Sequence, residues 1–197
     1  MTAMSASLER RDAVARLLAD RGDALVVTGL GSPTYDVHAV GDHDANYYLW
    51  GAMGAAALVG LGLAQARPER RVLVITGDGE QLMALGGLAT IAAARPTNLD
   101  IFVLDNEHYG ETGMQQSHTA LGVDLAAIAT AIGFVDSRIV TNEDELDQLI
   151  RDRSTSSTGP RLAVLKIRAD NPPRSMPSRD AVFIKNRFRS HLGLTPN

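Results

Sequence analysis

The stretch RVLVITGDGEQLMALGGLATIAAARPTNLDIFVLDNEHYGETG, residues 71–113, decides the fold of this chain. It holds two largely apolar runs, residues 72–75 and 99–104, and each run stops at polar or glycine residues. Such runs predict buried parallel strands. Apolar residues recur between them at helical spacing, namely Leu82, Leu85, Leu88 or Ala89, and Ala92. The pattern predicts a strand, a helix and a second strand whose polar ends share one edge of a sheet, where open α/β sheets bind ligands.

The two polar ends carry residues that suit a phosphate ligand and a magnesium ion. Gly77 and Gly79 allow the backbone to come close to a ligand, and a helix beginning near Glu80 would direct free N–H groups at an anion. Asp78 and Asn106 offer the hard oxygen ligands that Mg²⁺ prefers. The sequence therefore predicts a site for Mg²⁺ bridged to phosphate oxygens at this edge.

The remaining pattern predicts a doubly wound, mostly parallel α/β domain over residues 1–197. Helices are predicted over residues 7–21, 51–66, 124–132, 142–153 and 180–191, and strands over residues 24–28, 46–50, 134–140 and 162–167. The exit of the first strand, residues 29–34, is typical of a glycine turn, and Thr28, Ser32 and Thr34 are possible hydrogen-bond donors there. Residues 170–197 form an extended C-terminal segment, whose final helix either packs on the domain or closes over a cofactor.

Composition excludes several classes of function. The 197 residues are 45% hydrophobic, which suits one domain with a sizeable core. A formal charge of −4 gives no electrostatic case for nucleic acid or an anionic membrane as partner. The absence of cysteine excludes disulfides, thiolate catalysis and cysteine-ligated iron–sulfur clusters. Nothing resembling a signal peptide precedes Arg10, and the longest uncharged stretch, residues 51–66, is too short and glycine-rich to span a bilayer, so we expect a cytoplasmic protein.

The residues resemble a known enzyme superfamily. GDG at residues 77–79, an intervening helix, and DNEHYG at residues 105–110 resemble the Mg²⁺–thiamine diphosphate motif of the thiamine diphosphate-dependent decarboxylases. The likeness is to the cofactor-binding half of sulfopyruvate and phosphonopyruvate decarboxylases, and it includes WGAMG at residues 50–54. The sequence departs from it in places: Asp105 replaces the first residue of the usual Asn-Asn pair, Pro33 stands where relatives tend to have an arginine, and residues 113–119 replace a Gly-Gly-Gln-Pro-Thr segment that relatives often carry. The substrate therefore cannot be copied from the family name.

The resemblance implies roles for particular residues. The cofactor-binding set would be Ser32, Gly51, Met53, Gly77, Asp78, Gly79, Glu80, Asn106, Tyr109 and Gly110, and the Mg²⁺ ligands would be Asp78, Asn106 and the carbonyl of His108. Met53 would hold the cofactor in a bent shape, with the Gly51 carbonyl accepting from its aminopyrimidine; a core-filling Met53 is the alternative. Residues 113–119 should lie over the reaction centre, so Gln115, Gln116 and His118 are candidates for substrate contact or proton transfer. A solvated His118 is the alternative.

The reaction implied is decarboxylation of a 2-oxo acid to an aldehyde and CO₂. Alternatives are a carboligating synthase or lyase, the beta subunit of a 2-oxoacid:ferredoxin oxidoreductase, and a regulatory subunit without activity. In the superfamily, a glutamate on a pyrimidine-binding domain activates the cofactor, and this chain has room only for the diphosphate half. We therefore expect a separately encoded pyrimidine-binding subunit that supplies the glutamate, in a hetero-oligomer with at least two copies of each chain. An exposed half-site edged by Met53, Leu82, Met83 and Met114 would favour that association.

Overall fold

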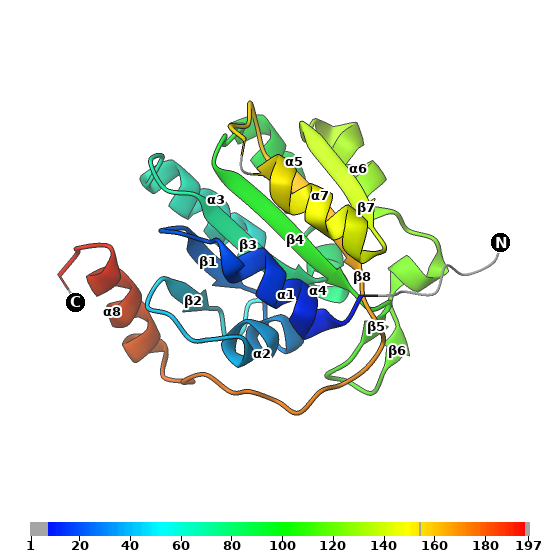
Figure 1. The fold of residues 1–197 in the computed structure, drawn as a ribbon, viewed down its shortest axis with the longest axis horizontal. Coiled ribbons are helices and arrows are strands. Elements are labelled where there is room, and N and C mark those ends of the chain that lie inside the picture. The colour runs from blue at the N-terminus through cyan, green and yellow to red at the C-terminus, as the bar shows by residue number, and fades with distance from the viewer. Residues whose placement is uncertain (1–7, 154, 196–197) are drawn as a thin grey trace.

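Six parallel strands form the main sheet in the computed structural model, which describes residues 8–153 and 155–195. They are β1 (Leu25–Thr28), β2 (Asn46–Tyr48), β3 (Val72–Gly77), β4 (Leu99–Asp105), β7 (Asp136–Val140) and β8 (Arg161–Lys166). Their order in the sheet is β2-β1-β3-β4-β8-β7, and every neighbouring pair is parallel (Figure 1). A separate antiparallel pair joins β5 (His108–Tyr109) to β6 (Gln115–Gln116). The predicted doubly wound, mostly parallel sheet is confirmed.

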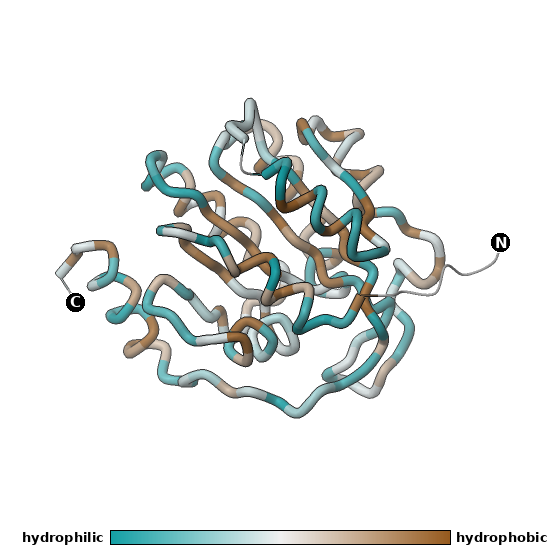
Figure 2. Tube along the Cα trace, viewed as in Figure 1, coloured by the Kyte–Doolittle hydropathy of each residue, from teal (hydrophilic) through white to brown (hydrophobic). Residues whose placement is uncertain are grey.

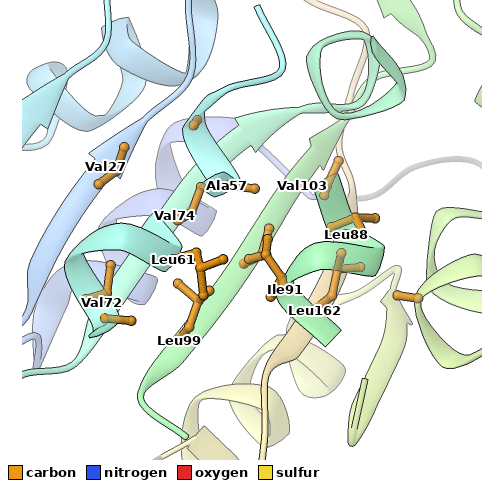
Figure 3. Packing of buried hydrophobic residues seen from close by; sticks show 14 of the residues in the cluster. Val27, Ala57, Leu61, Val72, Val74, Leu88, Ile91, Leu99, Val103 and Leu162 are labelled. Atoms are coloured by element: carbon orange, nitrogen blue, oxygen red, sulfur yellow. The ribbon is translucent and has the colours of Figure 1, made fainter. Parts of the chain in front are cut away.

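Helices cover both faces of this sheet. One face carries α1 (Arg10–Ala19), α2 (Ser32–Ala39) and α7 (Glu143–Arg153), and the other carries α3 (Ala56–Ala66), α5 (Leu85–Ala94) and α6 (Leu125–Ile132). Successive strand residues alternate between the two faces, so one central strand supplies both cores. Val74 and Leu99 pack beneath α3 and α5 with Leu61 and Ile91 (Figure 3). Figure 2 shows that hydrophobic residues concentrate along the central strands, whereas hydrophilic and hydrophobic residues alternate along α1 and α7.

The last helix, α8 (Ala181–His191), covers the open edge of the sheet at β2. Phe188 belongs to the core on one face and packs edge-on against Tyr47, with ring centroids 5.5 Å apart. Ile184 belongs to the core on the other face, and Arg187 forms a 2.6 Å ion pair with Asp42. Residues 168–180 reach this helix by running past α2 (Figure 1). These contacts make α8 a packed helix, which is one of the two expectations for it. Because α8 covers the edge at β2, that edge cannot pair with another strand.

The winding of the sheet reverses between β1 and β3. The chain leaves β1 through α2 toward β2, whereas β3 lies on the other side of β1 and leads into α4 (Asp78–Met83) and α5. The loops after β1 and β3 therefore run to opposite faces and open a crevice at the carboxyl ends of the two strands. Crevices of this kind bind the ligands of doubly wound proteins.

Several predicted boundaries were wrong. The turn predicted for residues 29–34 becomes helical at Ser32, because Pro33 fits the first helical turn without a missing hydrogen bond. The helix predicted from residue 51 begins at Ala56. The central helix begins two residues earlier than predicted and divides at Ala84, whose φ of −129° is not helical. The first helix starts at Arg10, and residue 7 lies outside the described residues.

Candidate functional site

A cleft with a cavity of about 110 Å³ opens at the carboxyl ends of β1, β3 and β4. Its lining comes from the β1 exit, the β3 exit, the β4 exit and one methionine: Leu30, Ser32, Pro33, Gly77, Asp78, Gly79, Glu80, Leu104, Asn106, His108, Tyr109, Gly110, Glu111, Thr112 and Met53. The cleft therefore lies at the point where the winding reverses. Most of the residues proposed from sequence for the cofactor or metal lie in this lining.

Two polar residues at the exit of β1, Thr28 and Thr34, are not available to a ligand. Thr28 and Thr34 are fully buried, and their hydroxyl oxygens lie 2.5 Å apart. Thr34 also donates to the carbonyl of Gly29 at 2.7 Å. These two threonines, which the sequence offered as possible donors, are therefore not available to a diphosphate, because their hydroxyls close the strand end internally. Ser32 lines the cleft.

Asp78 is a buried carboxylate without a cation of its own. Asp78 is 2% exposed. Within residues 8–153 and 155–195, no Lys, Arg or His forms a salt bridge with it. Ser117 donates to its Oδ2, and the hydroxyl of Thr119 lies 3.2 Å from the same oxygen. Burial raises the pKa of Asp78 to about 6, and the charge of Asp105 adds to the rise. A buried charge in this state is stabilised by a bound cation.

The β4 exit folds back on itself around Asn106. The Asn106 side-chain oxygen accepts from the backbone N–H of His108 at 3.1 Å, and His108 Nδ1 lies 2.8 Å from the Asn106 carbonyl oxygen. Glu107 between them has a φ of 62°, in the left-handed region. The His108 ring is thus turned toward its own loop, an arrangement that suits the prediction of the carbonyl as the metal ligand.

The carboxylate of Glu80 ties three loops together. It accepts from Thr76 Oγ1 at 2.9 Å and from the N–H of Gly54 at 3.3 Å, and it also accepts from the backbone of Leu30. Burial raises the pKa of Glu80, and these three donors act against that rise. The exits of β1 and β3 and the loop before α3 are therefore held at fixed positions around the cleft.

The ring of Tyr109 leaves no space for a side chain at residue 79, which is a glycine. A Cβ built at residue 79 would lie 2.4 Å from Cε1 of that ring, closer than any Cβ contact in a relaxed structure. The ring consequently lies directly over the turn after β3, and the two predicted residues form one wall of the cleft.

The loop before α3 carries Met53 into the cleft. Gly51, Ala52 and Gly54 have φ values of 106°, 52° and 91°, so these three residues lie in the left-handed region. Met53 is 41% exposed, lines the cleft and belongs to neither hydrophobic core. The core-filling alternative for Met53 is therefore wrong. Gly51 does not contribute to the lining, and its contact with a cofactor stays a prediction.

The candidate catalytic residues lie beside the cleft. Gln115, Gln116 and His118 are exposed, and none of them is part of its lining. Gln115 bonds to Thr112, and His118 Nδ1 lies 3.5 Å from the hydroxyl of Tyr109. Their roles stay predictions.

Ser117 and Thr119, which were not predicted from the sequence, lie next to the candidate residues Gln116 and His118. Ser117 and Thr119 are buried and reach Asp78, whereas Gln116 and His118 between and beside them point to solvent. Gln116 ends β6 and Ser117 is extended, so their side chains point to opposite sides, whereas His118 and Thr119 lie in a 3₁₀ helix, His118–Leu121, that begins directly after Ser117. The alternation of small hydroxyl residues with large polar ones in residues 116–119 was the signal that could have identified them.

Comparison with known proteins gives the family of the chain. Residues 31–165 match the family described as thiamine pyrophosphate enzyme, C-terminal TPP binding domain. The chain belongs to the thiamine pyrophosphate enzymes. The matched residues include every cleft residue except Leu30.

Curated members of the thiamine pyrophosphate enzymes resemble the chain over most of its length. It is 38% identical to the beta subunit of sulfopyruvate decarboxylase from Methanothermobacter thermautotrophicus, over 92% of this chain and 94% of that subunit. It is also 38% identical to phosphonopyruvate decarboxylase from Streptomyces viridochromogenes, over 93% of this chain but 46% of that protein. The chain therefore spans nearly a whole subunit of one relative and about half the length of the other.

A solved structure shares the fold. Benzoylformate decarboxylase from Polynucleobacter necessarius matches with a TM-score of 0.70 and 21% identity, over 86% of this chain and 36% of that one. At this identity the likeness concerns the fold alone.

The cleft residues fit thiamine diphosphate with Mg²⁺. Among the described residues no group of three or more His, Asp or Glu side chains has metal-binding geometry, so a metal here would need other oxygen ligands. Mg²⁺ meets this condition, because it commonly takes one or two carboxylates together with phosphate oxygens and water. Asp78 is the buried carboxylate without a cation, and Asn106 is the amide beside it. The site residues thus supply what a Mg²⁺–diphosphate group requires.

Proposed function

We propose that this chain is the diphosphate-binding subunit of a thiamine diphosphate-dependent 2-oxo acid decarboxylase. The observation that carries the proposal is Asp78, a buried carboxylate without a cation partner among the described residues, placed beside Asn106 in the cleft where the sheet reverses its winding. When bound, thiamine diphosphate supplies the carbon nucleophile and the electron sink for loss of CO₂ from a 2-oxo acid. The product would be an aldehyde.

The residues of this chain would bind and orient the cofactor. Asp78, Asn106 and the His108 carbonyl would hold Mg²⁺, with Ser117 and Thr119 fixing one oxygen of Asp78. Ser32 and the turn at Gly77 and Gly79 would hold the diphosphate. The left-handed loop before α3 would allow Gly51 to approach the aminopyrimidine, and Met53 would support the bent shape of the cofactor.

The substrate is expected to be a small 2-oxo acid. Relatives at 38% identity are named for sulfopyruvate and phosphonopyruvate, whose side chains end in an anion. In this chain the β1 exit presents Pro33 to the cleft, which offers no donor to an anion. Gln115, Gln116 and His118, beside the cleft, are our candidates for contact with the substrate and for proton transfer.

A second polypeptide would complete the site. A cavity of about 110 Å³ is smaller than the roughly 300 Å³ or more of pockets that enclose a small-molecule ligand. The helices on one face, α3, α5 and α6, contain no charged residue, whereas α1 and α7 on the other face contain many. Three large hydrophobic residues are exposed: Met53 in the cleft lining, Leu58 on α3 and Met83 at the end of α4.

These features support a pyrimidine-binding partner on the uncharged face. The partner would contribute the activating glutamate, and the assembly would contain at least two copies of each chain. The word "subunit" in the name of the Methanothermobacter relative agrees with a complex of this kind.

Activity measured with and without the partner tests the proposal. The full chain is incubated with thiamine diphosphate, Mg²⁺ and a panel of 2-oxo acids that includes sulfopyruvate and phosphonopyruvate, and CO₂ and aldehyde are measured. We expect activity only when the partner subunit, identified by co-purification from the native source, is added. Full activity of the chain alone would refute the split site, and no CO₂ from any acid with the partner present would refute the decarboxylase assignment.

A further inference from the structure

Lys166 is a cation placed beneath the proposed metal site. It is the last residue of β8 and pairs in register with Asp105, the last residue of β4. Its Nζ lies 2.9 Å from Asp105 Oδ2 and 2.6 Å from Glu107 Oε1. One ammonium group thus binds the acidic residues on both sides of Asn106. Lys166 does not line the cleft, and no sequence motif marks it as a site residue. Its contacts with the site run through Asp105 and Glu107.

Asp105 connects this cation to Asp78. The hydroxyl of Thr119 lies 2.7 Å from Asp105 Oδ1 and 3.2 Å from Asp78 Oδ2, and both carboxylates are 2% exposed. Two like charges this close and this buried repel each other strongly. Among the described residues, Lys166 is the only cation that forms a salt bridge with Asp105. It therefore compensates the charge nearest to the proposed metal ligand.

Glu107 gives Lys166 a second role. A residue with a Cβ is unfavourable in the left-handed region, where Glu107 has a φ of 62°. Three contacts hold it there: its N–H donates to Asp105 Oδ1 at 3.0 Å, its carbonyl accepts from the Ser117 N–H at 2.8 Å, and its carboxylate binds Lys166. The same turn sets the positions of Asn106 and His108.

We infer that Lys166 is a positioning residue for the Mg²⁺–diphosphate site. It compensates the charge of Asp105, which shares the Thr119 hydroxyl with Asp78, and it holds Glu107 in the turn that presents Asn106. The inference rests on the proposed function, since it concerns the site assigned there. Lys166 also allows residue 105 to be an aspartate. A buried aspartate at this position requires a compensating cation, whereas an asparagine would not.

A double-mutant cycle tests this role. Mg²⁺-dependent binding of thiamine diphosphate is measured by calorimetry on the full chain in its assembled form for wild type, Lys166→Met, Asp105→Asn and the double variant. We expect Lys166→Met to weaken binding by about 10- to 100-fold, the range seen when groups that support metal ligands are removed. The double variant should recover the part of this loss that comes from the uncompensated Asp105 charge, because an amide oxygen at residue 105 still accepts from Thr119 and Glu107, while the contact between Lys166 and Glu107 stays absent. Lys185→Met, a change at an exposed residue of α8, is the matched control and should bind as wild type does.

The outcomes separate this inference from the proposed function. If the wild type shows no Mg²⁺-dependent binding, the proposed site fails and this inference fails with it. If the wild type binds and Lys166→Met binds equally well, or if the losses of the two single variants simply multiply in the double variant, only the role of Lys166 is refuted. Thermal unfolding of each variant is recorded in parallel. Should Lys166→Met not fold, recovery of both folding and binding in the double variant supports charge compensation, and its absence refutes it.

Discussion

Replacing Asp78 by asparagine should stabilise the chain without ligands while abolishing its function. The carboxylate is buried, has no cation partner among the described residues and lies near Asp105. Asparagine has the same shape, and the hydroxyls of Ser117 and Thr119 can rotate to accept from an amide as readily as they donate to a carboxylate. The substitution therefore removes a buried charge and leaves the packing and the hydrogen bonds in place.

The magnitude follows from the pKa of Asp78. Burial, with a contribution from the Asp105 charge, raises this pKa from 3.8 to about 6. At about 1.4 kcal/mol per pKa unit, the ionised form lowers the free energy of unfolding by about 3 kcal/mol. Because the folded chain holds its proton up to a higher pH than the unfolded chain does, this loss develops as pH rises from about 4 to 6 and is complete above 6.

Thermal and urea unfolding at several pH values measure the effect. At pH 7.5 and without cofactor we expect Asp78→Asn to be more stable by at most about 3 kcal/mol, or roughly 2–4 °C in Tm for each kcal/mol. The gain should shrink toward zero near pH 4. Asp144→Asn, an exposed change in the first turn of α7, is the control and should alter stability by less than about 0.5 kcal/mol. A variant less stable than wild type at pH 7.5, or a gain independent of pH, would refute the reasoning.

Met53→Ala should keep cofactor affinity within about tenfold, or about 1.4 kcal/mol, while turnover falls much further. The reason is that Met53 would select the shape of the cofactor and would not bind its diphosphate. Equal losses of affinity in a titration and of turnover in kinetics would argue against this role. Gly79→Ala should weaken cofactor binding and cost about 1–3 kcal/mol of stability, because the new Cβ would lie 2.4 Å from the Tyr109 ring. Unfolding curves check it, and stability that is not regained in Gly79→Ala/Tyr109→Ala would exclude this collision as the cause. Mg²⁺-dependent binding should weaken as pH falls through about 6, because protons compete for the Asp78 carboxylate; equal affinities at pH 5 and 7.5 would contradict that assignment.

The parts of the fold that could be predicted from sequence are those fixed by local pattern. Central parallel strands are buried on both faces, so β3 and β4 appear as uninterrupted apolar runs whose ends are visible in the sequence. Once both strands are placed, Asp78 and Asn106 must lie at one edge of the sheet. The cleft places them there together with Ser32 and Tyr109.

The parts that could not be predicted depend on contacts between distant segments. Lys166 meets Asp105 only because β8 is the neighbour of β4, and nothing in the order of the residues states that register. Ser117 reaches Asp78 because the short β5–β6 hairpin turns the segment after β4 back toward the cleft. The start of α3 was misplaced because glycines that suit a helix opening also suit a left-handed loop.

No helix in residues 8–153 and 155–195 is long and apolar enough to cross a bilayer. The helical part of residues 51–66 is the eleven-residue α3. The cytoplasmic location stays a prediction.

Calorimetric titration with thiamine diphosphate, in the presence and absence of Mg²⁺, tests the central claim most directly. The wild-type chain in its assembled form is compared with Asp78→Ala and Asn106→Ala, and circular dichroism establishes that both variants are folded. The account predicts that the wild type binds the cofactor only with Mg²⁺ and that each variant loses this binding, because either change removes one of few protein ligands to the metal. Unchanged cofactor affinity in both folded variants would contradict the assignment of this cleft as the Mg²⁺–thiamine diphosphate site.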